Sequence, residues 1–355
     1  MEGSERLEDL AAQLTVDEDI LLVSTSKGAA IVMEEGIQEF KGILPFGWTL
    51  DGKILGTRLK KRGDRYELVE VDFDGNASIL YTSRRAIEFA APYRDRNHMI
   101  VIDSDVRRRS RILEVVLDSG DVRQLWDDTV KDLGCVHVHP DGRIAIAIED
   151  AILYGDDKEI KEFPLESSVY CMSGPPEHGI VQIIGDHHVI TFPQMTKDDD
   201  DNVVHRLIRL DTRTGKPRTI LICDSYDTQF TLSPDQHYLA MVADRFGALE
   251  STVFAFPSMK KIKRIHPDPD MNAVWMNDSK KLSMVVEGSI YSIDIPGDEP
   301  PIEYALPDNT RSLVGWRSPV GEVQNHGVNK PHNTRKVTKG DRINAFYIPA
   351  GDSSS

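Results

Sequence analysis

The segment CVHVHPDGRIAIAI (135–148) shows the pattern from which the fold can be predicted, a short polar turn between two apolar stretches. Tight turns favour Pro, Asp and Gly, and the alternating, β-branched flanks are typical of half-buried strands. Successive side chains of a strand point to opposite faces, so Cys135, His137 and His139 would share one face. The segment therefore predicts a β-hairpin, and it raises the question whether these three side chains form part of a metal site.

The same order of apolar strand, polar turn and apolar strand recurs six more times along the chain. The other stretches are FGWTLDGKILGT (46–57), FAAPYRDRNHMIVI (89–102), VYCMSGPPEHGIVQII (169–184), FTLSPDQHYLAMV (230–242), AVWMNDSKKLSMVV (273–286) and VGWRSPVGEV (314–323). One turn position in each gives 51, 95, 141, 177, 235, 278 and 320, with gaps of 44, 46, 36, 58, 43 and 42 residues. A four-stranded propeller blade takes about 40–50 residues, so this spacing predicts a β-propeller.

A second series of seven turns lies between the turns of the first series. Its members are MEEGIQ (33–38), DFDGNAS (72–78), LDSGDVR (117–123), YGDDKEI (154–160), LDTRTGKPR (210–218), FPSMKKI (256–262) and IPGDEPP (295–301). Asp and Gly in many of these segments suit tight turns between strands. The two interleaved series predict blades of four strands, A to D, in which the first series joins A to B and the second joins C to D.

The two ends of the chain predict how the ring closes. Residues 19–40 supply a C–D turn without a preceding A–B turn, whereas residues 311–317 supply a strand A without a later C–D turn. We therefore expect an all-β, seven-bladed propeller over residues 19–318, whose last blade combines these two segments. Closing the ring in this way hides an exposed sheet edge. An eighth, irregular blade built from 311–349 is the alternative.

Two extensions flank the predicted propeller, at residues 1–18 and 319–355. A helix over 4–15 would place four apolar side chains on one face: Leu7, Leu10, Ala11 and Leu14. We expect this helix either to pack on the ring or to bind a partner. The C-terminal extension is expected to be a loop or linker that contains one strand, RINAFYIP (342–349).

The turns SPDQ (233–236), HPDG (139–142) and LDTRTG (210–215) resemble those of WD-repeat-like β-propellers of the TolB type. This resemblance covers residues 19–320 and implies the fold rather than an activity. The segment KGDRINAFYIPAG (339–351) resembles the one that follows the propeller in the prolyl-oligopeptidase family. No G-x-S-x-G nucleophile motif occurs in the sequence, so the second resemblance implies a gating propeller without its hydrolase domain.

Composition and charge limit the classes of partner. The formal net charge of −16 argues against nucleic acid, which needs a basic binding surface. Three cysteines without a C-x-x-C pair favour a reducing compartment, and neither a secretory signal nor a membrane-spanning apolar run is visible. We therefore expect a cytoplasmic protein that binds a protein or peptide partner, without contact with a membrane or nucleic acid.

The sequence allows two interpretations of the side chains that share a face in the segment 135–148. Cys135, His137 and His139, with His188 from the next blade, could bind zinc or another transition metal in the central channel. That arrangement resembles the oligogalacturonate-lyase type of propeller and would imply a metal-dependent enzyme. Alternatively, His139 is a turn residue equivalent to Ser233, and the other two side chains pack between blades. The second answer is favoured, so we expect neither a metal nor another cofactor.

Three charged segments fall on predicted connections between strands B and C. The candidate binding residues are Lys60, Lys61, Arg62 and Arg65 in blade 2, Arg107, Arg108, Arg109 and Arg111 in blade 3, and Asp198, Asp199, Asp200 and Asp201 in blade 5. All B–C connections emerge on one face, so we expect that face to be basic on one side and acidic on the other. The Asp run is expected to lengthen blade 5 by roughly 15 residues, as an insertion in a regular repeat. Solvated loops without a partner are the alternative.

Three tryptophans, Trp48, Trp275 and Trp316, fall at equivalent positions near the ends of the predicted A strands. Their regular placement favours packing between blades over a ring of aromatic side chains that stacks on a ligand. With no complete catalytic motif in the sequence, we expect a non-catalytic scaffold that binds its partner across one face.

Overall fold

The computed structural model describes most of the chain between residues 19 and 317. The described residues are 19–59, 65–126, 130–131, 136–139, 141–148, 151–165, 180–197, 203–223, 228–245, 248–265, 273–276, 279–295, 297 and 300–317. They form 29 β-strands and no helix, so none of them belongs to a helix that could cross a membrane. The predicted helix over 4–15 and the predicted strand over 342–349 lie outside the described residues.

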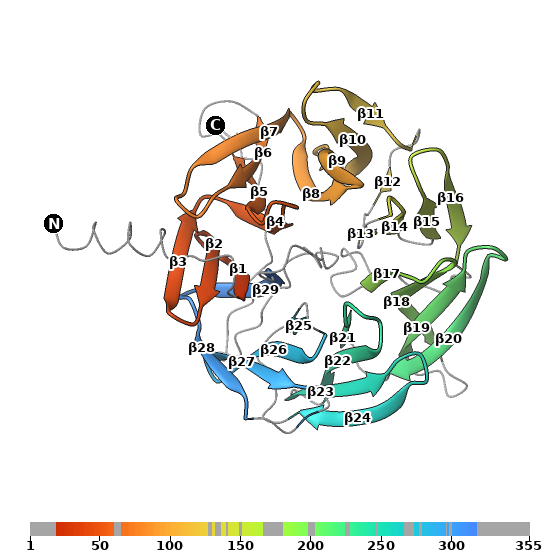
Figure 1. Ribbon diagram of the computed structural model, residues 1–355. Coiled ribbons are helices and arrows are strands. Elements are labelled where there is room, and N and C mark those ends of the chain that lie inside the picture. The colour runs from red at the N-terminus through yellow and green to blue at the C-terminus, as the bar shows by residue number, and fades with distance from the viewer. Residues whose placement is uncertain are drawn as a thin grey trace, which may run out of the picture.

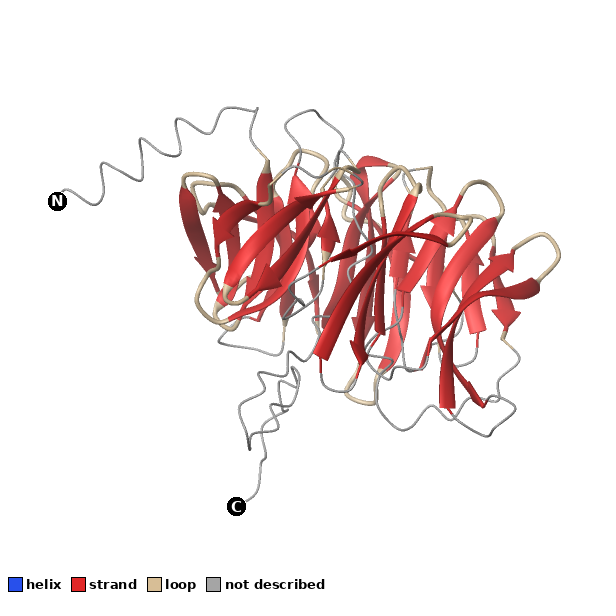
Figure 2. Ribbon diagram, turned by 90° about the horizontal axis from the view of Figure 1, so that it is seen from below, coloured by secondary structure: helices blue, strands red, loops and turns tan. Residues whose placement is uncertain are grey.

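Seven antiparallel sheets stand around a central axis like the blades of a propeller (Figure 1). Each blade has four strands, A to D, counted from the axis outward, and blade 3 has one additional short strand. Seen from the side, the strands run between two faces that carry the connecting loops (Figure 2). The all-β, seven-bladed fold expected from the turn spacing is confirmed.

The strands of blades 1 to 7 follow one order. The A strands are β29 (Thr310–Arg317), β4 (Leu44–Trp48), β8 (Ala86–Tyr93), β13 (Val136–Val138), β17 (Ile180–Ile184), β21 (Thr228–Leu232) and β25 (Val274–Trp275). The B strands are β1 (Ile20–Thr25), β5 (Ile54–Leu59), β9 (Asp95–Ser104), β14 (Ile144–Ala147), β18 (His188–Lys197), β22 (Tyr238–Arg245) and β26 (Lys281–Val286).

The outer strands follow the same order. The C strands are β2 (Gly28–Met33), β6 (Tyr66–Val71), β10 (Arg109–Val116), β15 (Ala151–Gly155), β19 (Val203–Asp211), β23 (Ala248–Ala255) and β27 (Ser289–Asp294). The D strands are β3 (Gly36–Lys41), β7 (Ala77–Ser83), β11 (Val122–Gln124), β16 (Ile160–Pro164), β20 (Lys216–Cys223), β24 (Lys260–Ile265) and β28 (Ile302–Ala305). The additional strand β12 (Val130–Lys131) pairs with β10.

The ring closes in blade 1 by pairing the two ends of the described chain. Strand β29 lies antiparallel to β1, with Ile20 opposite Arg317 and Leu21 opposite Trp316. Blade 1 therefore takes strand A from the C-terminal part and strands B, C and D from the N-terminal part, as predicted. This pairing covers the inner edge of β1, which would otherwise expose unpaired backbone N–H and C=O groups.

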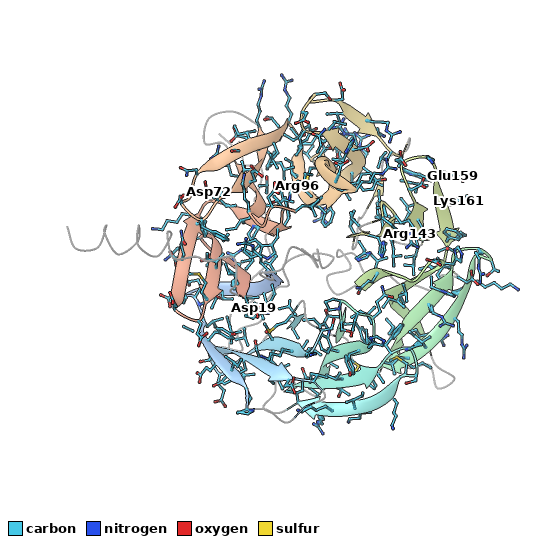
Figure 3. All side chains as sticks on the ribbon, in the orientation of Figure 1. Asp19, Asp72, Arg96, Arg143, Glu159 and Lys161 are labelled. Atoms are coloured by element: carbon cyan, nitrogen blue, oxygen red, sulfur yellow. The ribbon has the colours of Figure 1, made fainter. Side chains whose placement is uncertain are left out.

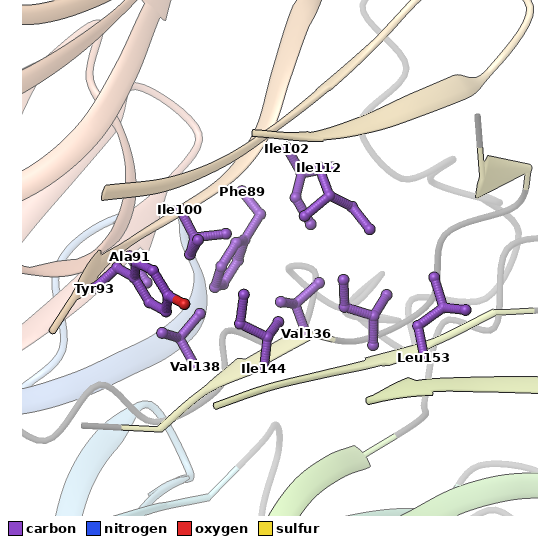
Figure 4. Close-up of a cluster of buried hydrophobic side chains, with 11 residues drawn as sticks. Phe89, Ala91, Tyr93, Ile100, Ile102, Ile112, Val136, Val138, Ile144 and Leu153 are labelled. Carbon is purple, nitrogen blue, oxygen red and sulfur yellow. The ribbon is translucent and has the colours of Figure 1, made fainter. Parts of the chain in front are cut away.

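The hydrophobic core is divided among the contacts between neighbouring blades. Each of the seven clusters of buried side chains joins residues of two adjacent blades. In Figure 4, for example, Phe89 and Ile100 of blade 3 face Val136 and Ile144 of blade 4. Strands β1 and β2 are buried along their whole length, whereas the outer strand β11 is exposed. An inner strand packs against a blade on each side, which explains why its sequence is almost continuously apolar.

The three equivalent tryptophans have the predicted structural role. Trp48, Trp275 and Trp316 are almost completely buried, with exposed fractions of 1%, 0% and 0%. Each indole N–H donates a hydrogen bond to the preceding blade: to the Gly315 carbonyl, the Thr231 carbonyl and Ser283 Oγ, over 3.1, 3.0 and 3.0 Å. The indoles thus fill the contacts between blades and fix their register, because a buried indole N–H needs an acceptor.

One predicted turn is wrong. The segment around position 177 was expected to be the A–B turn of blade 5, but strand A is Ile180–Ile184 and the turn follows at 185–187. With position 186 in place of 177, the turn positions of blades 2 to 7 are separated in the sequence by 44, 46, 45, 49 and 43 residues. The expected 15-residue lengthening of blade 5 is therefore also wrong. Its added length is modest, and strands β18 and β19, with 10 and 9 residues, are long.

We predict that Trp316 stabilises the closed ring. Substitution Trp316→Ala should lower the free energy of unfolding by about 3–5 kcal/mol, because it empties a buried site between blades 7 and 1. Trp316→Phe should cost about 1–3 kcal/mol through the lost hydrogen bond to Ser283 and the smaller ring. Urea unfolding followed by tryptophan fluorescence and circular dichroism measures both effects. The exposed Ile302→Thr, on β28, is the control and should change stability by less than about 0.5 kcal/mol; equal effects of all three would contradict this role.

Candidate partner-binding site

The B–C face of the propeller carries the B–C connections and the connections from each strand D to the next strand A. Antiparallel order within every blade puts both kinds of connection at the same end of the strands. The predicted residues Arg65, Arg107, Arg108, Arg109 and Arg111 lie at this end of blades 2 and 3. The predicted residues Lys60, Lys61, Arg62, Asp198, Asp199, Asp200 and Asp201 lie outside the described residues. The acidic side of the face therefore stays a prediction.

The B–C hairpin of blade 3 is held in shape by Asp105. Its Oδ1 accepts hydrogen bonds from the backbone N–H groups of Arg107 and Arg109, over 2.8 and 3.0 Å. Its Oδ2 accepts from Nε of Arg109 over 2.9 Å. The backbone N–H of Arg109 is the strongest influence that lowers the pKa of Asp105 to about 2, so this carboxylate is charged at neutral pH. Asp105 therefore fixes the turn that presents the arginines.

Directly beneath this hairpin, the carboxylate of Asp103 is completely buried. Arg111 binds it in a bidentate manner, with Nε 2.9 Å from Oδ1 and Nη2 2.7 Å from Oδ2. Ser83 Oγ donates to Oδ2 over 2.7 Å, and Nε of Arg85 lies 3.1 Å from Oδ1. Arg111 of blade 3 and Arg85 of the connection between blades 2 and 3 thus share one carboxylate, and the Ser83 hydrogen bond ties the end of β7 to β9. These partners offset the cost of removing the charge of Asp103 from water.

Two further arginines lie at the B–C end of blade 2. Strands β6 and β7 pair with Tyr66 opposite Ser83, so Arg65 and Arg84 flank this pair at the B–C end. Both are exposed, and within the described part of the chain neither has a carboxylate within 4 Å; the same holds for Arg107. Like charges at such neighbouring positions repel each other, and an anion that contacts both guanidinium groups would offset this repulsion.

An apolar side chain lies among these arginines. Val106, at the tip of the hairpin between Asp105 and Arg107, has an exposed fraction of 93%. The hydrogen bond from the Arg108 N–H to the Asp105 carbonyl, over 2.9 Å, closes the turn and holds Val106 outward. The site thus combines arginines that can bind carboxylates with an exposed apolar contact.

Among the predicted arginines, the structure distinguishes two roles. Arg109 and Arg111 are engaged with Asp105 and Asp103, so they organise the site. Arg65 and Arg107 are exposed, and neither has a carboxylate partner among the described residues. Both can therefore contact a ligand. Arg108 is also exposed, and its backbone has φ of 58°, in the left-handed region. Sequence reasoning missed Arg84, Arg85 and Asp103, because strand pairing brings them to the site from a D–A connection and from the strand before the hairpin.

The hairpin formed by β13 and β14 links blade 4 to blade 5. His137 is buried, and its Nδ1 accepts a hydrogen bond from the Ile183 N–H of blade 5 over 3.3 Å. His139 is a turn residue whose Nδ1 lies 2.8 Å from Oδ1 of Asp141. It occupies the turn position of Ser233, because in both turns this residue's carbonyl accepts from the N–H three residues later. The structural interpretation is therefore supported for these two histidines.

Arg143 makes a second link between blades 4 and 5, on the face of the propeller that carries the A–B turns (Figure 3). Its Nη1 donates to the carbonyls of Gly185 and Asp186, over 2.8 Å each, and its Nε donates to Asp141 Oδ2 over 2.7 Å. Burial alone would raise the pKa of Asp141, but the hydrogen bonds from Arg143 and His139 outweigh it and lower the pKa to about 2. His139, Asp141 and Arg143 therefore form an ion-paired clamp, and Arg143 connects this clamp to blade 5.

The metal hypothesis gains no support from the described residues. The rings of His137 and His139 are 6.2 Å apart between centroids, but His188 lies on strand B of blade 5 rather than on a strand that lines the channel. Burial, assisted by Arg209, lowers the pKa of His188. Within the part of the chain that the structure describes, no three His, Cys, Asp or Glu side chains are placed to hold a metal ion. Cys135 lies outside these residues.

Comparison of the sequence with protein families and with curated proteins finds no match. Solved structures, by contrast, share the propeller fold. A prolyl endopeptidase aligns with a TM-score of 0.55 and 12% identity, over 85% of this chain and 53% of that chain. An oligogalacturonate lyase in complex with manganese aligns with a TM-score of 0.52 and 12% identity, over 79% of this chain and 83% of that chain. At such identities, the likeness establishes the fold alone.

TolB from Acinetobacter baumannii also aligns, with a TM-score of 0.49 and 14% identity, over 84% of this chain and 81% of that chain. The prolyl endopeptidase match shows that the propeller fold also occurs in a protein of the second type named from the sequence. The chain belongs to the structural class of seven-bladed β-propellers, and its specific role has to be argued from its own side chains.

We predict that the clamp around Asp141 weakens in acid. The folded-state pKa of about 2 lies below the ordinary value of 3.8, so its contribution to stability is present above that ordinary value and is lost as pH falls through about 2. Asp141→Asn should therefore lower the unfolding temperature at about pH 6 and have a smaller effect at about pH 3. Thermal unfolding at several pH values measures this. Asp118→Asn, in an exposed turn of blade 3, is the control; a pH-independent effect of Asp141→Asn would contradict the clamp.

Proposed function

We propose that this protein is a non-catalytic recognition propeller that binds an acidic segment of a partner protein on its B–C face, where blades 2 and 3 meet. The observation that carries the proposal is that Arg65 and Arg84 flank the last strand pair of blade 2 as two exposed arginines without a carboxylate partner among the described residues. Arginine suits this role because its planar guanidinium binds carboxylates through two parallel hydrogen bonds.

The arginines are supported by ordered neighbours. Asp105 fixes the hairpin that carries Arg107, and Asp103 holds Arg85 and Arg111 behind it. A site whose geometry is set before binding loses less conformational entropy when the partner arrives. Val106 adds an apolar contact that a simple anion would not use. These features favour an acidic polypeptide over a free inorganic anion.

The charge of the whole chain also favours a short acidic segment over a nucleic acid as the partner. The formal net charge is −16, so a basic patch on this protein is a local exception to its overall field. Long polyanions such as nucleic acids would meet repulsion away from the patch, whereas a short acidic segment would not. The sparse cysteines support the cytoplasm as the place where the partner is met. Neither the gating role nor the channel metal site has a described side-chain arrangement in its favour.

The proposal predicts that a fluorescein-labelled peptide of six glutamates binds the wild-type protein at low salt. The triple variant Arg65→Glu, Arg84→Glu, Arg107→Glu should bind it at least about tenfold more weakly, because three contacts become repulsive. Fluorescence anisotropy measures the affinity, and raising the salt concentration should weaken wild-type binding.

The matched control carries the same change of net charge on the outer rim of blades 5 and 6: Lys216→Glu, Arg218→Glu, Lys260→Glu. It should bind the peptide within about twofold of wild type if contacts are local rather than due to the overall field. Equal losses in both triple variants, or no binding to wild type, would refute the proposed site. Inorganic phosphate at matched ionic strength tests the anion alternative, and complete competition by it would also count against a peptide site.

A further inference from the structure

The outermost strand of each blade has an edge that no other described strand covers. Edges of this kind attract further strands, and proteins discourage this with charged residues or proline. Six of the seven D strands contain such residues: Glu39 and Lys41 in β3, Arg123 in β11, Lys161, Glu162 and Pro164 in β16, Lys216, Pro217 and Arg218 in β20, Lys260, Lys261, Lys263 and Arg264 in β24, and Glu303 in β28. The exception is β7, with the sequence ASILYTS.

Strand β7 is both accessible and suited to pairing. Ala77, Ser78, Ile79 and Thr82 are exposed, and the exposed fraction of Ile79 is 52%. Its inner edge pairs with β6, and no described residue forms a backbone hydrogen bond with its outer edge. Ile, Leu, Tyr and Thr have high β propensity. As far as the described residues extend, the outer edge of blade 2 therefore has unpaired backbone N–H and C=O groups on an uncharged strand.

A bulge is the one protective feature of β7. The pairing with β6 shifts at Leu80, between Val69 opposite Ile79 and Leu68 opposite Tyr81. The outer strands β20 and β24 also have such a shift in their pairing, and they carry charges in addition. Strand β7 has the bulge but no charged residue. The bulge divides it into two uncharged segments, and the second, Tyr81–Ser83, is followed directly by Arg84.

The position of this edge links it to the arginines. Strand β7 ends at Ser83 on the B–C face, and the next residue, Arg84, flanks the Tyr66–Ser83 pair together with Arg65. A strand added to the outer edge would therefore have one end beside these two guanidinium groups. The charge complementarity identifies the occupant as an extended segment with carboxylates at that end.

We propose that the acidic partner segment binds by adding a fifth strand to blade 2, antiparallel to β7, with its acidic residues just before the strand. An antiparallel strand starts at the Ser83 end, so the preceding residues lie next to Arg65 and Arg84. Antiparallel pairing is the more stable arrangement per residue. This inference rests on the proposed function and adds the binding mode: backbone hydrogen bonds supply affinity and the arginines supply orientation.

Two synthetic peptides of identical composition test the orientation. One has three glutamates followed by alternating threonine and valine over six residues, and the other has the same six residues followed by three glutamates. Both are acetylated, amidated and fluorescein-labelled, and anisotropy measures their binding to the full chain. The first should bind at least about fivefold more tightly, and binding should slow amide hydrogen exchange in residues 77–83. Equal affinities, or tighter binding of the second peptide, would overturn the proposed strand.

A single substitution separates strand addition from simple charge attraction. Ile79→Lys places a charge on the exposed edge, as in β24, and should weaken binding of the first peptide by about tenfold despite adding a positive charge. Electrostatic attraction alone predicts the opposite change, so unchanged or tighter binding would overturn the inference. Ile222→Lys, on the exposed edge of β20, is the matched control and should leave the affinity within about twofold. Thr82→Lys repeats the test at a second exposed position, should Ile79→Lys fail to fold.

The two proposals fail in different ways. If the triple variant of Arg65, Arg84 and Arg107 binds both peptides as wild type does, the proposed function is wrong. If that triple variant loses binding while Ile79→Lys and Thr82→Lys keep it, the arginine site stands and the strand addition is wrong.

Discussion

No blade of this propeller can bury its hydrophobic surface by itself, and the rest of the structure depends on that constraint. Each of the seven clusters of buried side chains is shared by two neighbours, so every blade needs a blade on both sides. The requirement is satisfied only in a closed ring, which explains why β29 returns to pair with β1. Buried tryptophans at the ends of three A strands then set the distance between blades by hydrogen bonds to the preceding blade.

Because the blade contacts provide the stability, the two faces of the ring can differ in chemistry. On the A–B face, charged side chains are used in bridges: Arg143 binds the next blade, and Arg96 pairs with Asp51 over 2.8 Å. On the B–C face, blades 2 and 3 hold Asp103 and Asp105 in place but leave Arg65, Arg84 and Arg107 without described carboxylate partners. A rigid ring can keep such an arrangement, because its own fold does not rely on those arginines.

Turn composition predicted the fold well because turns and strands are local. All seven C–D turns and five of the A–B turns fall where the sequence placed them. The turn near 177 was misplaced because its Gly-Pro-Pro segment is richer in turn residues than the true turn at 185–187, although the repeat spacing favours the latter. The site was only partly predictable. Arg107 and its neighbours stand out as a run, whereas the roles of Arg84 and Asp103 depend on cross-strand register, which a single sequence does not specify.

We propose that an acidic partner segment binds along the edge of β7 and contacts the arginines at its end. The most direct measurement is a crystal structure of the full chain with the peptide that has its glutamates before the strand. We expect an additional strand beside β7, with peptide carboxylates within about 4 Å of the guanidinium groups of Arg65 and Arg84. A peptide bound over the central channel or on the A–B face, with these arginines facing solvent, would contradict it.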